Sequence, residues 1–158
     1  MRLPELGPDK MDVYSYPVNQ EKTRLATIFT IKPRESVEKP GRSLSVIWDK
    51  RNPFIEGFEN NYDYVVTFEN KGEKAGDHYH HSKQELFTPV AGQVKIILEN
   101  INTKETEEIT INSKDHKILY IPTNIAHTVI SDSDICVLLV IATFPNNQAD
   151  EVPYEVSR

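Results

Sequence analysis

Short runs of alternating hydrophobic and polar residues follow one another from residue 26 onward, with turn-forming residues between the runs. Side chains two apart on a β-strand share a face, so this alternation is typical of half-buried strands. The pattern predicts strands over residues 26–32, 43–49, 62–69, 85–90, 93–99, 105–111, 117–121, 127–131 and 135–144. Because no long amphipathic helix separates these runs, we expect an antiparallel sandwich or barrel.

The two ends of the chain lack this alternation. Residues 1–25 contain three prolines, and residues 145–158 contain two prolines and two asparagines. We therefore predict one barrel domain over residues 26–144, with an N-terminal arm of residues 1–25 and a C-terminal arm of residues 145–158. Each arm could lie over the barrel, swap onto a partner subunit or close the mouth of the barrel.

Composition narrows the class of protein. The 158 residues are 38% hydrophobic, which is enough for one sizeable core. Lysine and arginine total 18 against 24 acidic residues, and the net charge of -6 argues against a nucleic-acid partner. No apolar run approaches the roughly 20 residues of a membrane helix, and the N-terminal residues do not resemble a signal peptide. The single cysteine, Cys136, lies in an apolar run, so we expect core packing in the reducing cytoplasm.

Four potential metal ligands stand out between residues 78 and 127. His78 and His80 are two residues apart, so on a strand both point to the same face, and Glu85 opens the next strand. His127 begins a further strand after the turn at Pro122. Three imidazoles and a carboxylate suit a divalent transition metal such as Zn, Fe, Mn, Ni or Co, with one or two positions left open. The alternative is a polar surface patch with an isolated core histidine.

The spacing of these residues resembles the two motifs of the cupin superfamily. Its first motif is matched at every position, by Gly72, His78, His80, Glu85 and Gly92. Its second motif is matched by Pro122 and His127, whereas Asn124 replaces a glycine and Ser131 replaces an asparagine. Asparagine tolerates the left-handed turn conformation, so the first departure is mild.

The resemblance covers residues 26–144 and carries several expectations. It implies an all-β fold, a double-stranded β-helix or cupin jelly-roll barrel, here with irregular N- and C-terminal arms. It implies that His78, His80, Glu85 and His127 bind a metal, and that the protein is a homodimer. Trp48 would then lie either at the dimer interface or in the core. His81 follows a predicted ligand but faces the other way by strand parity.

The segment from Asp77 to Phe87 is similar to cupin domains of bacterial polysaccharide biosynthesis, including the C-terminal domain of the bifunctional capsular-polysaccharide epimerase/reductase. Nucleotide-sugar 3,4-ketoisomerases and 3,5-epimerases belong to the same broad group. The similarity implies proton abstraction α to the carbonyl of a nucleotide-linked keto-sugar, with a metal polarising the carbonyl. Our candidates for the proton transfer are His81, Lys83 and Tyr120. They could instead be a solvent-facing imidazole, a surface lysine and a barrel aromatic.

Two other functions fit the same residues. One is an Fe(II)-dependent dioxygenase of a small organic substrate, which would require iron and consume oxygen. The other is a cupin that binds a sugar or metabolite without turning it over. The fold alone does not choose among these, because many functions are built on one fold.

Overall fold

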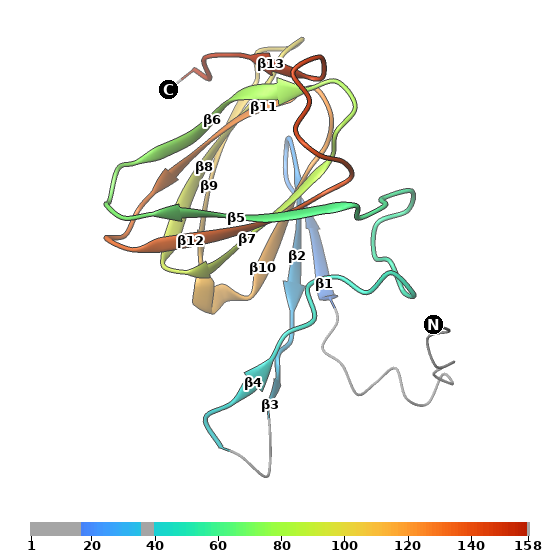
Figure 1. The fold of residues 1–158 in the computed structure, drawn as a ribbon, viewed down its shortest axis with the longest axis vertical. Helices are drawn as coiled ribbons and strands as arrows, with labels where there is room; N and C mark the ends of the chain where they lie inside the picture. Colours follow the sequence, from blue (N-terminus) through green and yellow to red (C-terminus); the bar gives the residue numbers. More distant parts are fainter. Residues whose placement is uncertain (1–16, 36–39, 158) are drawn as a thin grey trace.

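The computed structural model describes residues 17–35 and 40–157, and in it two antiparallel sheets pack face to face (Figure 1). The six-stranded sheet has the order β1 (Pro17–Lys22), β2 (Thr27–Ile31), β10 (Lys117–Ile121), β7 (Glu85–Ala91), β12 (Cys136–Ala142), β5 (Tyr62–Phe68). The five-stranded sheet has the order β13 (Glu151–Pro153), β6 (Lys74–His80), β11 (Ile125–Ser131), β8 (Gln93–Asn100), β9 (Thr106–Asn112).

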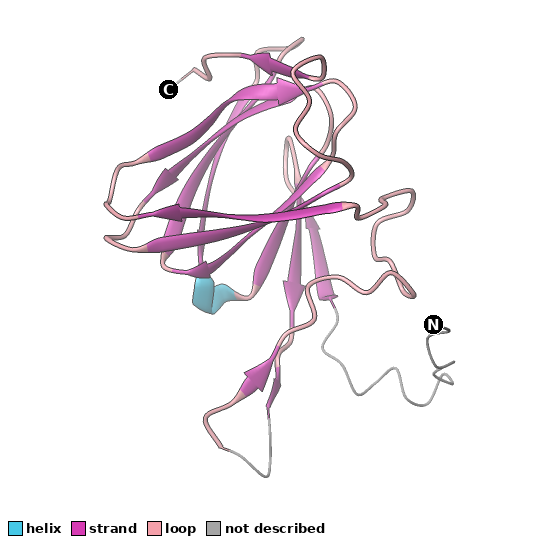
Figure 2. Cartoon of the chain, viewed as in Figure 1, coloured by secondary structure: helices cyan, strands magenta, loops and turns pink. Residues whose placement is uncertain are grey.

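Three short elements complete the described secondary structure. The strands β3 (Arg34–Glu35) and β4 (Ser43–Leu44) pair with each other and protrude from the body of the molecule (Figure 1). A single 3-10 turn, η2 (Ser113–Asp115), joins β9 to β10 (Figure 2). Among the described residues, no helix has the length and apolar character needed to span a membrane.

The all-β cupin-like sandwich predicted from the sequence is confirmed. From β6 onward the chain passes from one sheet to the other at almost every connection, and only the β8–β9 hairpin stays within one sheet. The turn between β6 and β7 and the turn between β10 and β11 therefore lie at the same end of the sandwich. This topology brings the predicted metal ligands on β6, β7 and β11 together.

The main core lies between the sheets. The six-stranded sheet contributes Phe87 and Leu119, and the five-stranded sheet contributes Ile96, Leu98 and Val129, among others. Burial of these side chains is the dominant favourable contribution to folding. Cys136 is fully buried in this core, as its apolar surroundings in the sequence predicted.

A second apolar cluster covers the outer face of the six-stranded sheet. Trp48 packs there between Phe54 and Phe58, with its ring centroid 5.0 Å from each. The predicted strand over residues 43–49 is therefore wrong beyond Leu44, because Trp48 and its neighbours cover the sheet as an irregular segment instead of pairing with it. Of the two places expected for Trp48, it takes the one inside its own chain, in this apolar cluster.

Short strands occur in both segments that we expected to form arms. Pro17–Lys22 forms the edge strand β1, and Glu151–Pro153 forms β13, which pairs with β6. Neither has a hydrophobic alternation that would reveal a strand. Residues 1–16 of the expected N-terminal arm lie outside the described residues.

Candidate functional site

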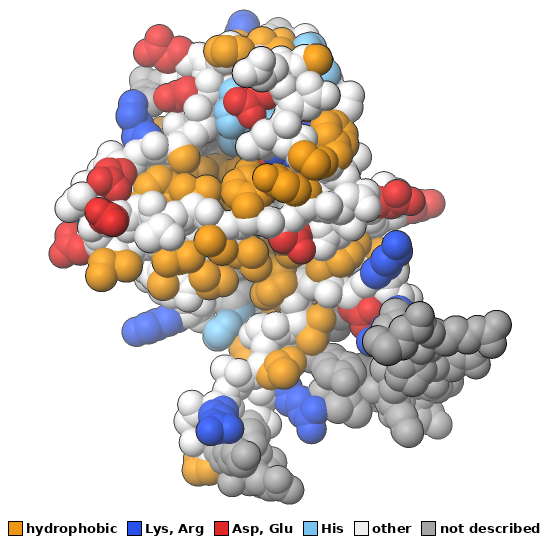
Figure 3. Space-filling model, in the orientation of Figure 1, with side chains coloured by type: hydrophobic (Ala, Val, Ile, Leu, Met, Phe, Trp, Pro, Cys, Tyr) orange, Lys and Arg blue, Asp and Glu red, His pale blue; other side chains and the backbone are white. Residues whose placement is uncertain are grey.

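The four predicted metal ligands converge at one end of the sandwich. His78, His80, Glu85 and His127 each offer a donor atom, and these atoms lie within 4.8 Å of one another. Glu85, His80 and His127 are almost completely buried, whereas the side chain of His78 is 21% exposed. Histidine side chains are visible at a hollow between the layer with β6 and β11 and the layer with β5 and β12 (Figure 3). We call these four side chains the His/Glu centre.

A β-bulge in β6 determines which side chains face this centre. His78 pairs with His127 and Ala75 pairs with Val129, so Asp77 is an extra residue on β6. Gly76 and Asp77 both have positive φ angles, of 102° and 60°. Without the bulge, strand alternation from the inward-facing Ala75 would turn Tyr79 inward in place of the histidines.

Each histidine of the centre has an oxygen atom near its outer ring nitrogen. Nδ1 of His127 lies 3.2 Å from the carbonyl oxygen of Ile125. Nδ1 of His80 lies 3.3 Å from Oδ2 of Asp150, and Nδ1 of His78 lies 3.6 Å from Oε1 of Glu151. Metal-binding histidines usually donate their second N–H to such an acceptor, which fixes the ring and leaves the other nitrogen for the ion.

The inner atoms of the centre are poorly satisfied by protein partners. Oε2 of Glu85 lies 3.2 Å from Nε2 of His127 and 3.6 Å from Nε2 of His80. Within the described part of the chain, Oε2 of Glu85 and both ring nitrogens of His80 are buried without a well-directed hydrogen bond. Buried polar atoms of this kind are uncommon unless something else binds them. Nitrogen and carboxylate donors that converge in this way could hold a metal ion.

Lys83 lies beside the centre and contacts Oε1, the second carboxylate oxygen of Glu85. Its Nζ is 3.1 Å from Oε1 of Glu85 and donates to Oδ1 of Asn146 at 2.6 Å, and the residue is 2% exposed. The hydroxyl of Tyr64 also donates to Oε1, at 3.2 Å. The alternative that Lys83 is a surface lysine is therefore excluded. Because Oε1 is occupied, Oε2 remains for the histidines.

Burial and charge set the protonation of the centre. Burial alone would raise the pKa of Glu85, but His127, Lys83 and His80 outweigh it and hold that pKa well below its usual range. Burial, reinforced by the neighbouring His127 and His80, lowers the pKa of His78 to about 4. Burial also raises the pKa of Tyr64, and Glu85 reinforces this effect. At neutral pH the centre therefore combines an ionised carboxylate with a neutral His78 imidazole and a neutral Tyr64 phenol.

The other two candidates for proton transfer lie away from the centre. His81 is exposed and packs against Tyr79, with ring centroids 5.2 Å apart, on the opposite face of β6. Tyr120 packs against Phe58 on the outer face of the six-stranded sheet, and its hydroxyl donates to Gln84 at 2.7 Å. Only Lys83 of the three candidates is thus brought to the centre.

Four residues around the centre were not identified from the sequence. Tyr64 comes from β5, and Asn146, Asp150 and Glu151 come from the C-terminal segment. Asp150 also accepts the backbone amides of Ser82 at 2.7 Å and Lys83 at 3.2 Å, which fixes the turn between β6 and β7. The C-terminal segment had only the composition of an arm, so no local pattern marked these residues.

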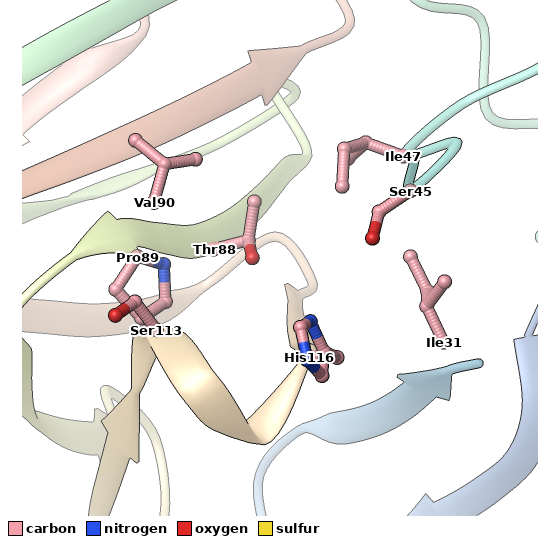
Figure 4. Close-up of a pocket in the computed structure, with 8 residues that line it drawn as sticks. All are labelled: Ile31, Ser45, Ile47, Thr88, Pro89, Val90, Ser113 and His116. Atoms are coloured by element: carbon pink, nitrogen blue, oxygen red, sulfur yellow. The ribbon is translucent and has the colours of Figure 1, made fainter. Parts of the chain in front are cut away.

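His116, the remaining histidine, lies at a separate cavity of about 200 Å³ (Figure 4). The lining is largely apolar with a few hydroxyl groups, and consists of Ile31, Ser45, Ile47, Thr88, Pro89, Val90, Ser113 and His116. None of the four donors of the His/Glu centre lines it. His116 ends η2 in the left-handed conformation, with φ of 53°.

The chain matches a known protein family over most of its length. The family model described as the polysaccharide biosynthesis C-terminal domain matches residues 48–152. No curated protein sequence matches the chain.

Several solved structures share the fold. A variant of the 3,4-ketoisomerase QdtA from Thermoanaerobacterium thermosaccharolyticum, in complex with TDP-4-keto-6-deoxyglucose, has a TM-score of 0.69 at 21% identity, covering 84% of this chain and 89% of that chain. The 3,5-epimerase RmlC from Legionella pneumophila, in complex with dTDP-4-keto-L-rhamnose, has a TM-score of 0.72 at 16% identity, covering 85% and 76%. The TDP-fucose-3,4-ketoisomerase WlaRA from Campylobacter jejuni has a TM-score of 0.67 at 21% identity, covering 80% and 87%. At these identities the comparison establishes a shared RmlC-like cupin fold.

Proposed function

Because the chain belongs to the polysaccharide biosynthesis C-terminal domain family, we propose that it is an isomerase or epimerase of a nucleotide-linked keto-sugar. The observation that carries the proposal is the His/Glu centre, where three histidines and an ionised carboxylate meet at one end of the sandwich. Structurally similar proteins bind TDP-linked 4-keto-sugars. A substrate of this kind has an acidic C–H next to a carbonyl, which suits proton abstraction.

The proposed reaction removes the proton α to the ketone and returns it to a different carbon or to the other face. A divalent transition metal held by His78, His80, Glu85 and His127 would stabilise the negative charge that develops on the carbonyl oxygen. Lys83 is the candidate for proton transfer that lies beside the centre. As a neutral amine it would accept the α proton, and as the ammonium so formed it would return that proton to the other carbon or the other face. His81 and Tyr120 are less suited to this role, because they lie on faces directed away from the centre.

A second route needs no metal. His78 is neutral at pH 7 and is the most exposed histidine of the centre, so in the metal-free protein its imidazole can accept the substrate proton. Glu151, facing Nδ1 of His78, would then stabilise the imidazolium that forms. The two routes differ in whether removal of metal abolishes activity.

The test is solvent exchange with nucleotide-linked 4-keto-sugars in deuterated water, followed by mass spectrometry. We expect the protein to introduce deuterium into at least one substrate, and Glu85→Gln to abolish this. His116→Asn is the matched control, because asparagine tolerates the left-handed conformation and His116 lies away from the centre. The same assay after treatment with a chelator separates the two routes. No exchange across a panel of such sugars would overturn the proposal.

The other two functions predict different outcomes of simple measurements. An Fe(II)-dependent dioxygenase would contain iron and consume oxygen with its substrate. A binding cupin would bind the sugar without exchanging its protons. Elemental analysis of the protein purified without added metal and an oxygen electrode distinguish these from the isomerase.

We also propose that the protein forms a homodimer in the cytoplasm. Support for self-association comes from exposed apolar residues, Val65 at 59% and Val90 at 53%, on the outer face of the six-stranded sheet. Patches of this kind commonly mark interfaces. Size-exclusion chromatography with light scattering tests the dimer, and a monomeric mass would contradict it.

A further inference from the structure

The C-terminal residues 146–157 connect the His/Glu centre to the opposite face of the five-stranded sheet, and we call this segment the C-terminal strap. At one end the strap supplies Asn146, Asp150 and Glu151, which contact Lys83, His80 and His78 respectively. At the other end it reaches the outer face of β8. The same short segment therefore contacts both the centre and a distant part of the sheet.

A buried carboxylate anchors the far end of the strap. Glu99 on β8 is 2% exposed, and its neighbour Leu98 faces the core, so Glu99 points to the outer face. The hydroxyl of Tyr154 donates to Oε1 of Glu99, and the backbone amide of Ser157 donates to Oε2 at 2.8 Å. Both oxygens of Glu99 are thus used to hold the strap.

Two further contacts strengthen this anchor. Nζ of Lys104 donates to the Tyr154 hydroxyl at 2.8 Å and lies 5.0 Å from the centroid of its ring. Val156 is buried on the outer face against a small apolar cluster that includes Ile97 and Ala126. Burial opposes ionisation of Glu99, but the hydrogen bonds from Tyr154 and Ser157 outweigh it and lower its pKa, so the anchor is charge-assisted.

The backbone holds the strap to β6 over a short stretch. β13 has three residues, and its last residue, Pro153, has no N–H to donate to β6. The register places Glu151 opposite His80 and Pro153 opposite His78. Two further backbone hydrogen bonds, from the amide of Tyr154 to the carbonyl of Asp77 at 2.9 Å and from the amide of His81 to the carbonyl of Asp150 at 3.3 Å, extend this short pairing at its ends. Beyond them, the strap is held by its side-chain anchors.

We propose that Glu99 and Tyr154 are positioning residues, which fix the strap so that the carboxylates of Asp150 and Glu151 stay beside the outer ring nitrogens of His80 and His78. The inference deepens the proposed function and rests on it, because the alignment of His80 and His78 matters only if the centre binds a cation or substrate. Without the anchor, the strap would leave the turn at Ser82 and Lys83, and the rings of His80 and His78 would lose the neighbouring carboxylates. The centre would remain present but would be less well organised for a cation.

The test compares Tyr154→Phe with the wild-type protein, because phenylalanine keeps the ring packing and removes only the hydroxyl. Glu107→Gln is the control: Glu107 also accepts several hydrogen bonds, from Thr23 and Leu25 among others, but it anchors the β1–β2 turn and does not touch the strap. Hydrogen exchange of the Ser82 and Lys83 amides reports whether Asp150 stays in place. Titration with Zn²⁺ and the absorption spectrum of bound Co²⁺ report the state of the centre.

We expect Tyr154→Phe to speed exchange of both amides and to weaken Zn²⁺ binding by about tenfold, the lower end of what loss of outer acceptors typically costs. Glu107→Gln should leave both measurements unchanged. Equal amide exchange in the variant and the wild type, or unchanged Zn²⁺ affinity despite faster exchange, would overturn the inference. If the wild-type protein binds neither Zn²⁺ nor Co²⁺, the metal part of the proposed function fails, whereas the exchange measurement still decides whether Tyr154 anchors the strap.

Discussion

The ammonium nitrogen of Lys83 lies 3.1 Å from Oε1 of Glu85, and both side chains are almost completely buried. A buried pair of this kind balances its own desolvation only while both partners are present. Its position also directs Oε2 of Glu85 toward His127 and His80. The pair therefore links the stability of the fold to the arrangement of the centre.

Replacing Lys83 by methionine is expected to destabilise the metal-free protein by about 3–5 kcal/mol, because a buried carboxylate loses its cationic partner. Saturating Zn²⁺ should recover much of this loss, since the ion supplies the missing positive charge. Urea unfolding in chelator and in Zn²⁺ measures both effects. Lys95→Met is the control, because the pair between Lys95 and Glu108 is exposed and worth at most about 1 kcal/mol. Equal losses in the two variants would contradict the role of the buried pair.

The bulge in β6 yields a second prediction, through Gly76. A Cβ atom at this position would lie 2.7 Å from the carbonyl oxygen of His127, and the φ angle of 102° disfavours any other residue. We expect Gly76→Ala to destabilise the fold by about 2–4 kcal/mol and to weaken metal binding, because β6 must move away from β11.

The control for this variant is Gly72→Ala. Gly72 has a similar φ angle of 91°, but a Cβ there would meet nothing within 4 Å. The difference between the two free energies of unfolding isolates the contact with His127 from the backbone strain. Similar losses of stability, with intact metal binding in both variants, would show that the close approach to His127 is unimportant.

The sequence predicted the inner part of the site better than its surroundings. The strand period and motif spacing identified His78, His80, Glu85 and His127, which the cupin topology then brings together. Lys83 sits in a polar run that is typical of a surface, and its burial depends on Glu85 and on the distant Asn146. A partner as far away in the chain as Asn146 leaves no local pattern.

The same reason explains the errors in the fold. Residues 45–49 have strand-like composition, but Trp48 is drawn into the aromatic cluster with Phe54 and Phe58. β13 has only three residues, too few to show an alternation, and its place is set by contacts with β6. In both cases tertiary contacts decide the local structure.

Asp150 gives a prediction about the outer acceptors. In Asp150→Asn the carboxylate that faces Nδ1 of His80 loses its charge, so we expect Zn²⁺ affinity to fall by about 10–100-fold. Asparagine retains one oxygen for the amide of Ser82, which limits the loss of stability. Isothermal titration measures the affinity, and Asp134→Asn, in an exposed turn at the other end of the sandwich, is the control. An affinity unchanged from wild type would mean that Asp150 serves only to hold the turn.

The metal-free protein is expected to lose stability as the pH falls below neutral. The pKa of His78 is lowered to about 4 in the folded protein, against an ordinary value near 6.5. Between these two values the unfolded chain binds a proton that the folded chain does not, so the free energy of unfolding decreases as the pH falls through this window. Above the window the stabilising contribution of the neutral His78 is complete. The lowered pKa of Glu85 adds a further loss below its ordinary pKa of about 4.3. Urea unfolding in chelator from about pH 8 to about pH 4 measures the slope. His78→Gln should flatten it, whereas His116→Asn should not, and an undiminished slope in His78→Gln would rule out this histidine as its source.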